Sequence, residues 1–129
     1  MSTTEIPRSL RNWFVLHFVL DLLLAIPLMI APVATLCFFG WQTVDPIATR
    51  IVAAALFGIG IESYLGRYAG IEAYQGMLNL KIIWSLAAVV GFLSSLLLGA
   101  QGAPIMAWVA LVVFALFNLL WVYWRWRLA

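Results

Sequence analysis

Long apolar segments alternate with short polar stretches along the whole chain. The segments cover approximately residues 13–39, 46–67, 71–98 and 104–126. Each is at or above the ~20 residues that a helix needs to cross the hydrocarbon core of a bilayer. The pattern therefore predicts an all-α membrane protein, built as a bundle of four transmembrane helices. Because the connections are short, consecutive helices are expected to be antiparallel neighbours.

Proline and aspartate mark the expected helix ends and irregularities. Pro27 removes one backbone hydrogen bond and clashes with the preceding turn, so the first helix is expected to kink near this residue. Pro32 is a second position at which this helix can end or bend. Asp45 can cap the second helix, and Pro46 suits its first turn.

Composition supports a membrane protein over a soluble one. Of 129 residues, 66% are hydrophobic and 9% are charged, whereas roughly 25% are charged in an average globular domain. A soluble domain of this length could not remove so much apolar surface from water. Since little sequence is left for an extramembrane domain, residues 1–129 are expected to form a single polytopic membrane domain.

The basic residues give the expected orientation. One side of the predicted bundle holds both termini and the second loop, and it carries five arginines, whereas the other side carries only Arg50. The five are Arg8, Arg11, Arg67, Arg125 and Arg127. Positively charged loops stay in the cytoplasm, so both termini are predicted to be cytoplasmic. A bacterial inner (plasma) membrane is the expected location of this multi-pass protein.

A few polar residues interrupt the apolar segments, and they form the candidate site. They are His17, Asp21, Glu62, Lys81 and Asn118. Counting ~1.5 Å of rise per residue places all of them in the same layer, near the cytoplasmic boundary. Burying such groups in hydrocarbon is expensive, so each needs a partner or a function.

Spacing indicates which polar groups can meet. His17 and Asp21 are four residues apart and share a helix face, which permits a hydrogen bond or an ion pair. Glu62 lies on a line of small residues repeated every four positions, expected to form a groove for a neighbouring helix. Small residues expected to pack helices closely are Gly58, Gly66, Gly91, Ser95 and Gly99. Candidate accessory residues around the polar layer are Tyr64, Arg67, Trp84 and Ser85.

The polar layer allows two interpretations. In the structural one, Glu62 pairs with Lys81 or Arg67 and Asp21 pairs with His17, so that the set holds the helices in register. In the functional one, the carboxylates bind a cation, a proton or a polar headgroup.

Several function classes lose support from the sequence. The chain has no glycine loop that would hold phosphate and no arrangement of a nucleophile with a base, so no catalytic residue is assigned and no enzyme is expected. One histidine and one cysteine make an intrachain metal or haem site unfavourable, and no cofactor is expected. The scattered basic residues do not form a nucleic-acid-binding face.

The sequence favours a small non-enzymatic integral membrane protein that acts through helix–helix or lipid contacts, as an accessory subunit or scaffold. Its expected partners are membrane lipids and either a second copy or another membrane protein. The alternative is a proton- or cation-linked small-molecule transporter, oligomeric, that uses Glu62 and Asp21.

Overall fold

The computed structural model describes residues 5–99 and 102–129, and this part of the chain is helical without strands. Its helices are α1 (Arg8–Ile30), α2 (Pro32–Phe38), α3 (Pro46–Leu65), α4 (Ile71–Leu97) and α5 (Ile105–Arg127). Four of them, α1, α3, α4 and α5, are long and apolar enough to cross a membrane. The prediction of an all-helical protein with four candidate spans is confirmed, and the chain has the architecture of a multi-pass integral membrane protein.

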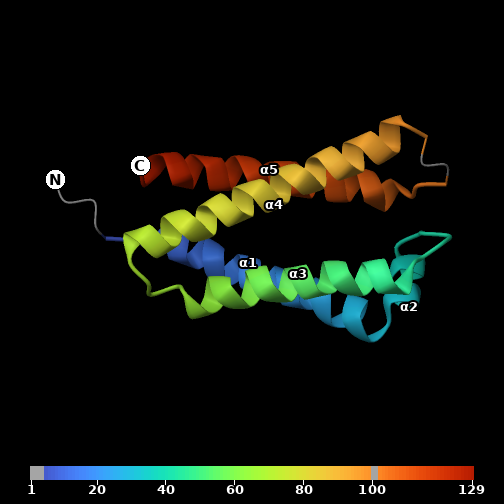
Figure 1. The fold of residues 1–129 in the computed structure, drawn as a ribbon, viewed down its shortest axis with the longest axis horizontal. Helices are drawn as coiled ribbons and strands as arrows, with labels where there is room; N and C mark the ends of the chain where they lie inside the picture. Colours follow the sequence, from blue (N-terminus) through green and yellow to red (C-terminus); the bar gives the residue numbers. More distant parts are fainter. Residues whose placement is uncertain (1–4, 100–101) are drawn as a thin grey trace.

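The long helices form two antiparallel pairs (Figure 1). α1 packs along α3, and α4 packs along α5. The pairs approach each other at the end that holds the C-terminus and the α3–α4 connection, here called the termini end. They diverge toward the opposite end, here called the far end, where α2 lies.

The first apolar segment is two helices, where one helix over residues 13–39 with a kink at Pro27 was expected. α1 begins earlier, at Arg8, continues through Pro27 and ends at Ile30. Ala31 leaves the helical conformation (φ −138°, ψ 68°), and α2 then begins at Pro32. The residue before a proline is sterically disfavoured in the helical region, so the break falls at Ala31 because Pro32 follows it.

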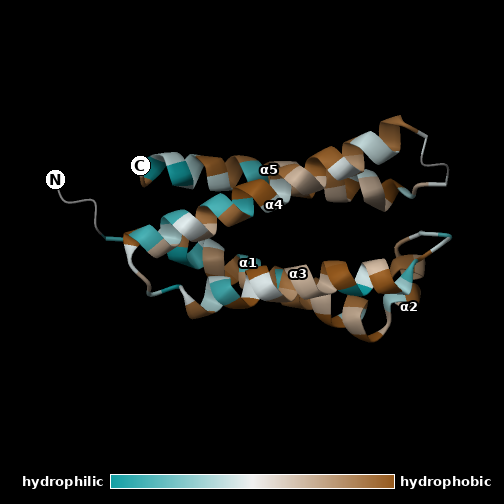
Figure 2. Ribbon diagram, viewed as in Figure 1, coloured by the Kyte–Doolittle hydropathy of each residue, from teal (hydrophilic) through white to brown (hydrophobic). Residues whose placement is uncertain are grey.

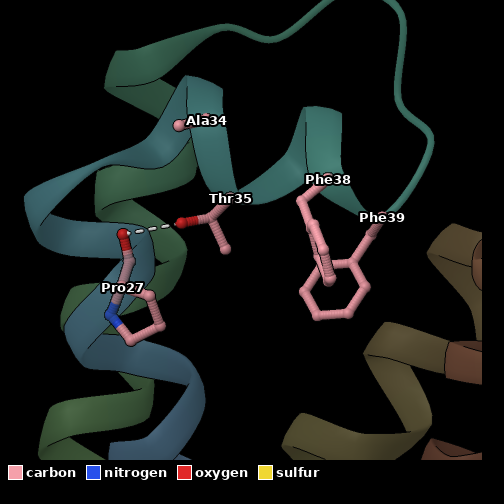
Figure 3. A pocket seen from close by; sticks show the side chains of 5 residues that line it. All are labelled: Pro27, Ala34, Thr35, Phe38 and Phe39. Carbon is pink, nitrogen blue, oxygen red and sulfur yellow. Dashed lines mark hydrogen bonds between the residues drawn. The ribbon is translucent and has the colours of Figure 1, made fainter.

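A hydrogen bond from Thr35 to the carbonyl of Pro27 connects the two pieces. This oxygen accepts from the backbone N–H of Ala31 at 2.8 Å and from the Thr35 hydroxyl at 3.0 Å. Figure 3 shows the Thr35 side chain on α2 pointing back to α1 across the break. A small hollow of about 370 Å³ lies beside this bond, lined by Pro27, Ala34, Thr35, Phe38 and Phe39.

α3 begins where the sequence predicts. The Asp45 carboxylate accepts hydrogen bonds from the backbone N–H groups of Ile47 (2.9 Å) and Ala48 (3.2 Å), and Pro46 is the first helical residue. These bonds satisfy N–H groups that have no partner within the helix. α3 ends at Leu65, two residues before the predicted end, and α4 and α5 lie within one residue of their predicted bounds.

Among the residues that the structure describes, two buried clusters form the core. The first lies at the termini end and joins α1, α4 and α5 through Leu10, Phe14, Tyr74, Leu78, Trp121, Trp124 and Leu128. The second joins α1 to α3 through Ala25, Leu28, Ala53 and Leu56. Figure 2 shows that the hydrophilic positions of α4 gather in its half toward the termini end.

Candidate functional site

The centre of the polar layer is Lys81 of α4, whose side chain is 1% exposed. Its ammonium nitrogen Nζ lies 2.5 Å from His17 Nδ1 of α1 and 2.5 Å from the Ser63 hydroxyl of α3. One buried cation therefore connects three helices, two from one pair and one from the other. We call His17, Asp21, Ser63 and Lys81 the Lys81 network.

Asp21 extends this network along α1. Its Oδ1 lies 3.3 Å from His17 Nε2, one helical turn away. The ammonium group of Lys81 has only hydrogens to offer, so His17 Nδ1 accepts. The other ring nitrogen, Nε2, is then free to carry a proton and donate to the carboxylate. The geometry thus fits a chain of donors from Lys81 through a neutral imidazole to Asp21.

Aromatic rings enclose the cation on the side toward the termini end. Lys81 Nζ lies 4.7 Å from the centre of the Phe14 ring and 4.9 Å from that of Trp121. The His17 ring is 5.1 Å from Trp121 and 5.3 Å from Phe117, centre to centre. The negative faces of aromatic rings attract a cation, and the attraction is stronger where water is excluded.

A second set of polar side chains, Ser85 one helical turn after Lys81 and Asn118 of α5, connects α4 to α5. The Ser85 hydroxyl donates to the backbone carbonyl of Lys81 at 2.7 Å. The amide nitrogen of Asn118 donates to the carbonyl of Ile82 and to the Ser85 hydroxyl, both at 3.0 Å. Asn118 and Ser85 therefore hold α5 against α4 beside the network.

The structure brings His17, Asp21 and Lys81 together, with Ser85 and Asn118 beside them, but it does not bring in Glu62. Glu62 is exposed on α3 and forms no ion pair with Lys81 or Arg67 within residues 5–99 and 102–129. The neighbouring Ser63 faces the core in its place and is 1% exposed. Consecutive residues of a helix are ~100° apart around its axis, so assigning the buried face of α3 one residue away exchanges the two.

Arg67 and Tyr64 lie in a separate group at the termini end. The Arg67 guanidinium carbon is 3.7 Å from the centre of the Tyr64 ring and 4.7 Å from that of Tyr68. The side chain of Arg11 lies over Tyr68 and donates from Nε to the carbonyl of Arg67. This cationic and aromatic group is typical of a membrane–water interface.

The predicted packing glycines differ in their surroundings. A Cβ placed on Gly66 would lie 2.9 Å from Met77 Sδ, which is the close approach expected of a packing glycine. A Cβ placed on Gly58, Gly91 or Gly99 would meet no atom within 4 Å in the described part of the chain. The predicted groove along Gly58 and Glu62 of α3 therefore faces away from the described helices. On α4, the residues Trp84, Gly91 and Ser95 line an apolar cleft.

Sequence reasoning missed two residues that contact the network. Ser63 binds Lys81, and Gly60 lets α1 approach, since a Cβ placed on Gly60 would lie 2.8 Å from Cβ of Asp21. A signal was present: Ala53, Leu56, Gly60 and Ser63 follow a 3–4–3 spacing that places small and apolar residues on one helix face.

One oxygen of the Asp21 carboxylate takes no part in the hydrogen bonds of the network. Oδ2 is buried and has no hydrogen-bond partner among the residues that the structure describes. A buried polar atom without a partner requires an explanation, either structural or functional.

Comparison with protein-family models, with curated proteins and with solved structures finds no match to this chain.

Proposed function

We propose that this chain is a small non-enzymatic integral membrane protein that acts through helix–helix and lipid contacts, as an accessory subunit or scaffold. The supporting observation is the engagement of Lys81, whose ammonium group contacts His17 and Ser63 and lies within 5 Å of the centres of two aromatic rings. A cation bound in this way joins the helix pairs and leaves few donors for a substrate. The arginines favour cytoplasmic termini, and we place the protein in a bacterial inner membrane.

The alternative is a proton- or cation-linked carrier. The observation that favours it is Asp21 Oδ2, a buried carboxylate oxygen beside His17 without a partner in the described chain. An ionisable group inside a membrane is a frequent component of ion pathways. Glu62, exposed on α3, would have to act from the outer surface of this bundle, in contact with a second copy or with lipid.

Reconstituted vesicles distinguish the two functions. Asp21→Asn removes the carboxylate that faces His17, whereas Glu62→Gln makes the same chemical change on an exposed position of α3. For the parent protein, for Asp21→Asn and for Glu62→Gln, we expect no proton or monovalent-cation flux above that of protein-free vesicles. We further expect Asp21→Asn to lower the free energy of unfolding by about 1 kcal/mol and Glu62→Gln to change it by less than about 0.5 kcal/mol.

The opposite pattern would support the carrier. Flux through the parent protein that disappears in Asp21→Asn, while the unfolding free energy stays the same, would contradict a structural role. Flux that disappears in Glu62→Gln would also support the carrier, and it would assign the pathway to the exposed face of α3.

A further inference from the structure

An apolar cleft of about 760 Å³ lies between the two helix pairs, on the far-end side of the Lys81 network. It is lined from all five helices, and central contributors are Leu24, Leu28, Leu56, Trp84, Gly91 and Ala107. No charged residue is among its lining residues in the part of the chain that the structure describes. Of its hydroxyl groups, that of Thr49 already donates to the carbonyl of Asp45 at 2.7 Å.

Contacts between the pairs close the cleft at both ends. At the termini end, Lys81 binds His17 and Ser63 one turn before Trp84. At the far end, the α2–α3 connection lies against the start of α5. A Cβ placed on Gly40 would lie 2.9 Å from Cβ of Pro104. The cleft is open sideways, since its lining residues Leu24 and Val52 are 38% and 44% exposed.

The depth of the cleft identifies what can enter it. On α4 it extends from Trp84 to Leu96, twelve residues or ~18 Å of helix. This length is close to one leaflet, half of the ~30 Å hydrocarbon core. An apolar cavity excludes water and accepts apolar molecules, and the molecules present at this depth are lipid chains.

A transmembrane helix of a second protein fits this space poorly. Such a helix needs ~30 Å to cross the hydrocarbon core, whereas the cleft is ~18 Å long along α4 and is closed at both ends. A flexible hydrocarbon chain can enter from the side and end within the cleft.

We propose that the cleft binds one hydrocarbon chain of a membrane lipid, taken from the leaflet at the far end. This inference rests on the proposed function, because it names the lipid contact through which the protein acts. The two are tested separately. Asp21→Asn reports on helix packing, whereas substitutions of residues that line the cleft report on lipid entry.

Gly91 offers a direct way to fill the cleft. It lines the cleft, and a Cβ placed on it meets no atom within 4 Å, so Gly91→Phe projects a ring into open space. Its neighbour Val90 is 56% exposed and does not line the cleft, which makes Val90→Phe a matched control. Ala110→Phe fills the cleft from α5 and provides a second variant if Gly91→Phe fails to fold.

The experiment uses phosphatidylcholine vesicles that contain a phospholipid with a diazirine in the middle of one acyl chain. After irradiation, labelled residues are mapped by peptide mass spectrometry. The informative positions are Leu28, Leu56 and Ala107, which line the cleft yet are only 3–4% exposed. We expect these residues to be labelled in the parent and in Val90→Phe, and to lose their label in Gly91→Phe and Ala110→Phe.

Three results would overturn the proposal. The first is an absence of label at Leu28, Leu56 and Ala107 in the parent. The second is label at these residues that survives in every filled variant that folds. The third, from native mass spectrometry of the same vesicles, is a dimer that Gly91→Phe abolishes, which would assign the cleft to a second copy.

Discussion

Lys81 shows how one residue is accommodated where its charge is unfavourable. A lysine inside a transmembrane helix opposes membrane insertion, by up to about 3 kcal/mol at the helix centre. Here two acceptors, one of them linked to a carboxylate, and two aromatic faces surround the ammonium group. Each is a modest contribution, but together they replace much of the water that the cation has lost.

The two neighbouring glycines of α3 test the packing around this network. Gly60→Ala would place its methyl group 2.8 Å from Cβ of Asp21, whereas Gly58→Ala meets nothing within 4 Å. We expect Gly60→Ala to lower the free energy of unfolding by ~1–3 kcal/mol through overpacking. Gly58→Ala should be neutral or stabilising by up to ~1 kcal/mol, because alanine favours the helix.

Reversible unfolding in mixed detergent–lipid micelles measures both changes. Equal effects of the two substitutions would show that α3 is rotated differently from the structure described here.

The level of a polar residue along its helix was predictable from the sequence. The side of the helix on which it lies was less predictable. Counting along each apolar segment placed His17, Asp21 and Lys81 in one layer, and the structure brings them into contact.

The rotation of α3 decided between Glu62 and Ser63. Small residues lie on two faces of α3, one with Gly58 and Glu62 and the other with Gly60 and Ser63, so small-residue spacing alone allows either face to be the buried one. A carboxylate in an apolar segment needs a partner, which made Glu62 a candidate. A serine such as Ser63 can satisfy its hydroxyl on its own helix and gives no such signal.

At the scale of the helices, local chemistry sets most boundaries. Asp45 and Pro46 start α3, and Pro32 forces Ala31 out of the helical conformation. The sequence analysis identified Pro27 as the main irregularity because a proline inside a helix removes a hydrogen bond. α1 continues through Pro27, and the break comes four residues later, at Ala31. The carbonyl of Pro27 keeps its ordinary helical bond from the N–H of Ala31 and also accepts the hydroxyl of Thr35.

The Asp45 cap gives a prediction for α3. Asp45→Ala removes the acceptor for the N–H groups of Ile47 and Ala48 and is expected to lower the free energy of unfolding by ~1 kcal/mol. Asp45→Asn retains a side-chain oxygen and should lose much less. Hydrogen exchange of the first turn of α3 in bicelles should accelerate in Asp45→Ala alone, and equal exchange in both variants would contradict the assigned cap.

For the whole molecule, four candidate spans could be read from hydrophobic length, but their division into two pairs could not. Short connections are compatible with a closed bundle, in which α3 and α4 would pack along their full length. The observed pairs instead meet through the apolar cluster at the termini end that contains Phe14 and Trp121, through the Lys81 network, and through the loops at Gly40 and Pro104. The apolar cleft lies between the network and these loops. Such long-range arrangements depend on side-chain fit among all helices, which a helix-by-helix pattern does not encode.

The central claim is that Lys81 joins the helix pairs, and a double-mutant cycle with His17 tests it most directly. The cycle compares Lys81→Met, His17→Leu and the double variant by unfolding free energy in bicelles. A second cycle, of Lys81→Met with Thr35→Val on α2, serves as the control for independent sites.

We expect a coupling of at least ~1 kcal/mol between Lys81 and His17, at the upper range of polar contacts measured between transmembrane helices. The Lys81–Thr35 cycle should be additive to within ~0.5 kcal/mol. Additive effects of Lys81→Met and His17→Leu, with no greater coupling than in the control cycle, would contradict a structural connection between α1 and α4 through this lysine.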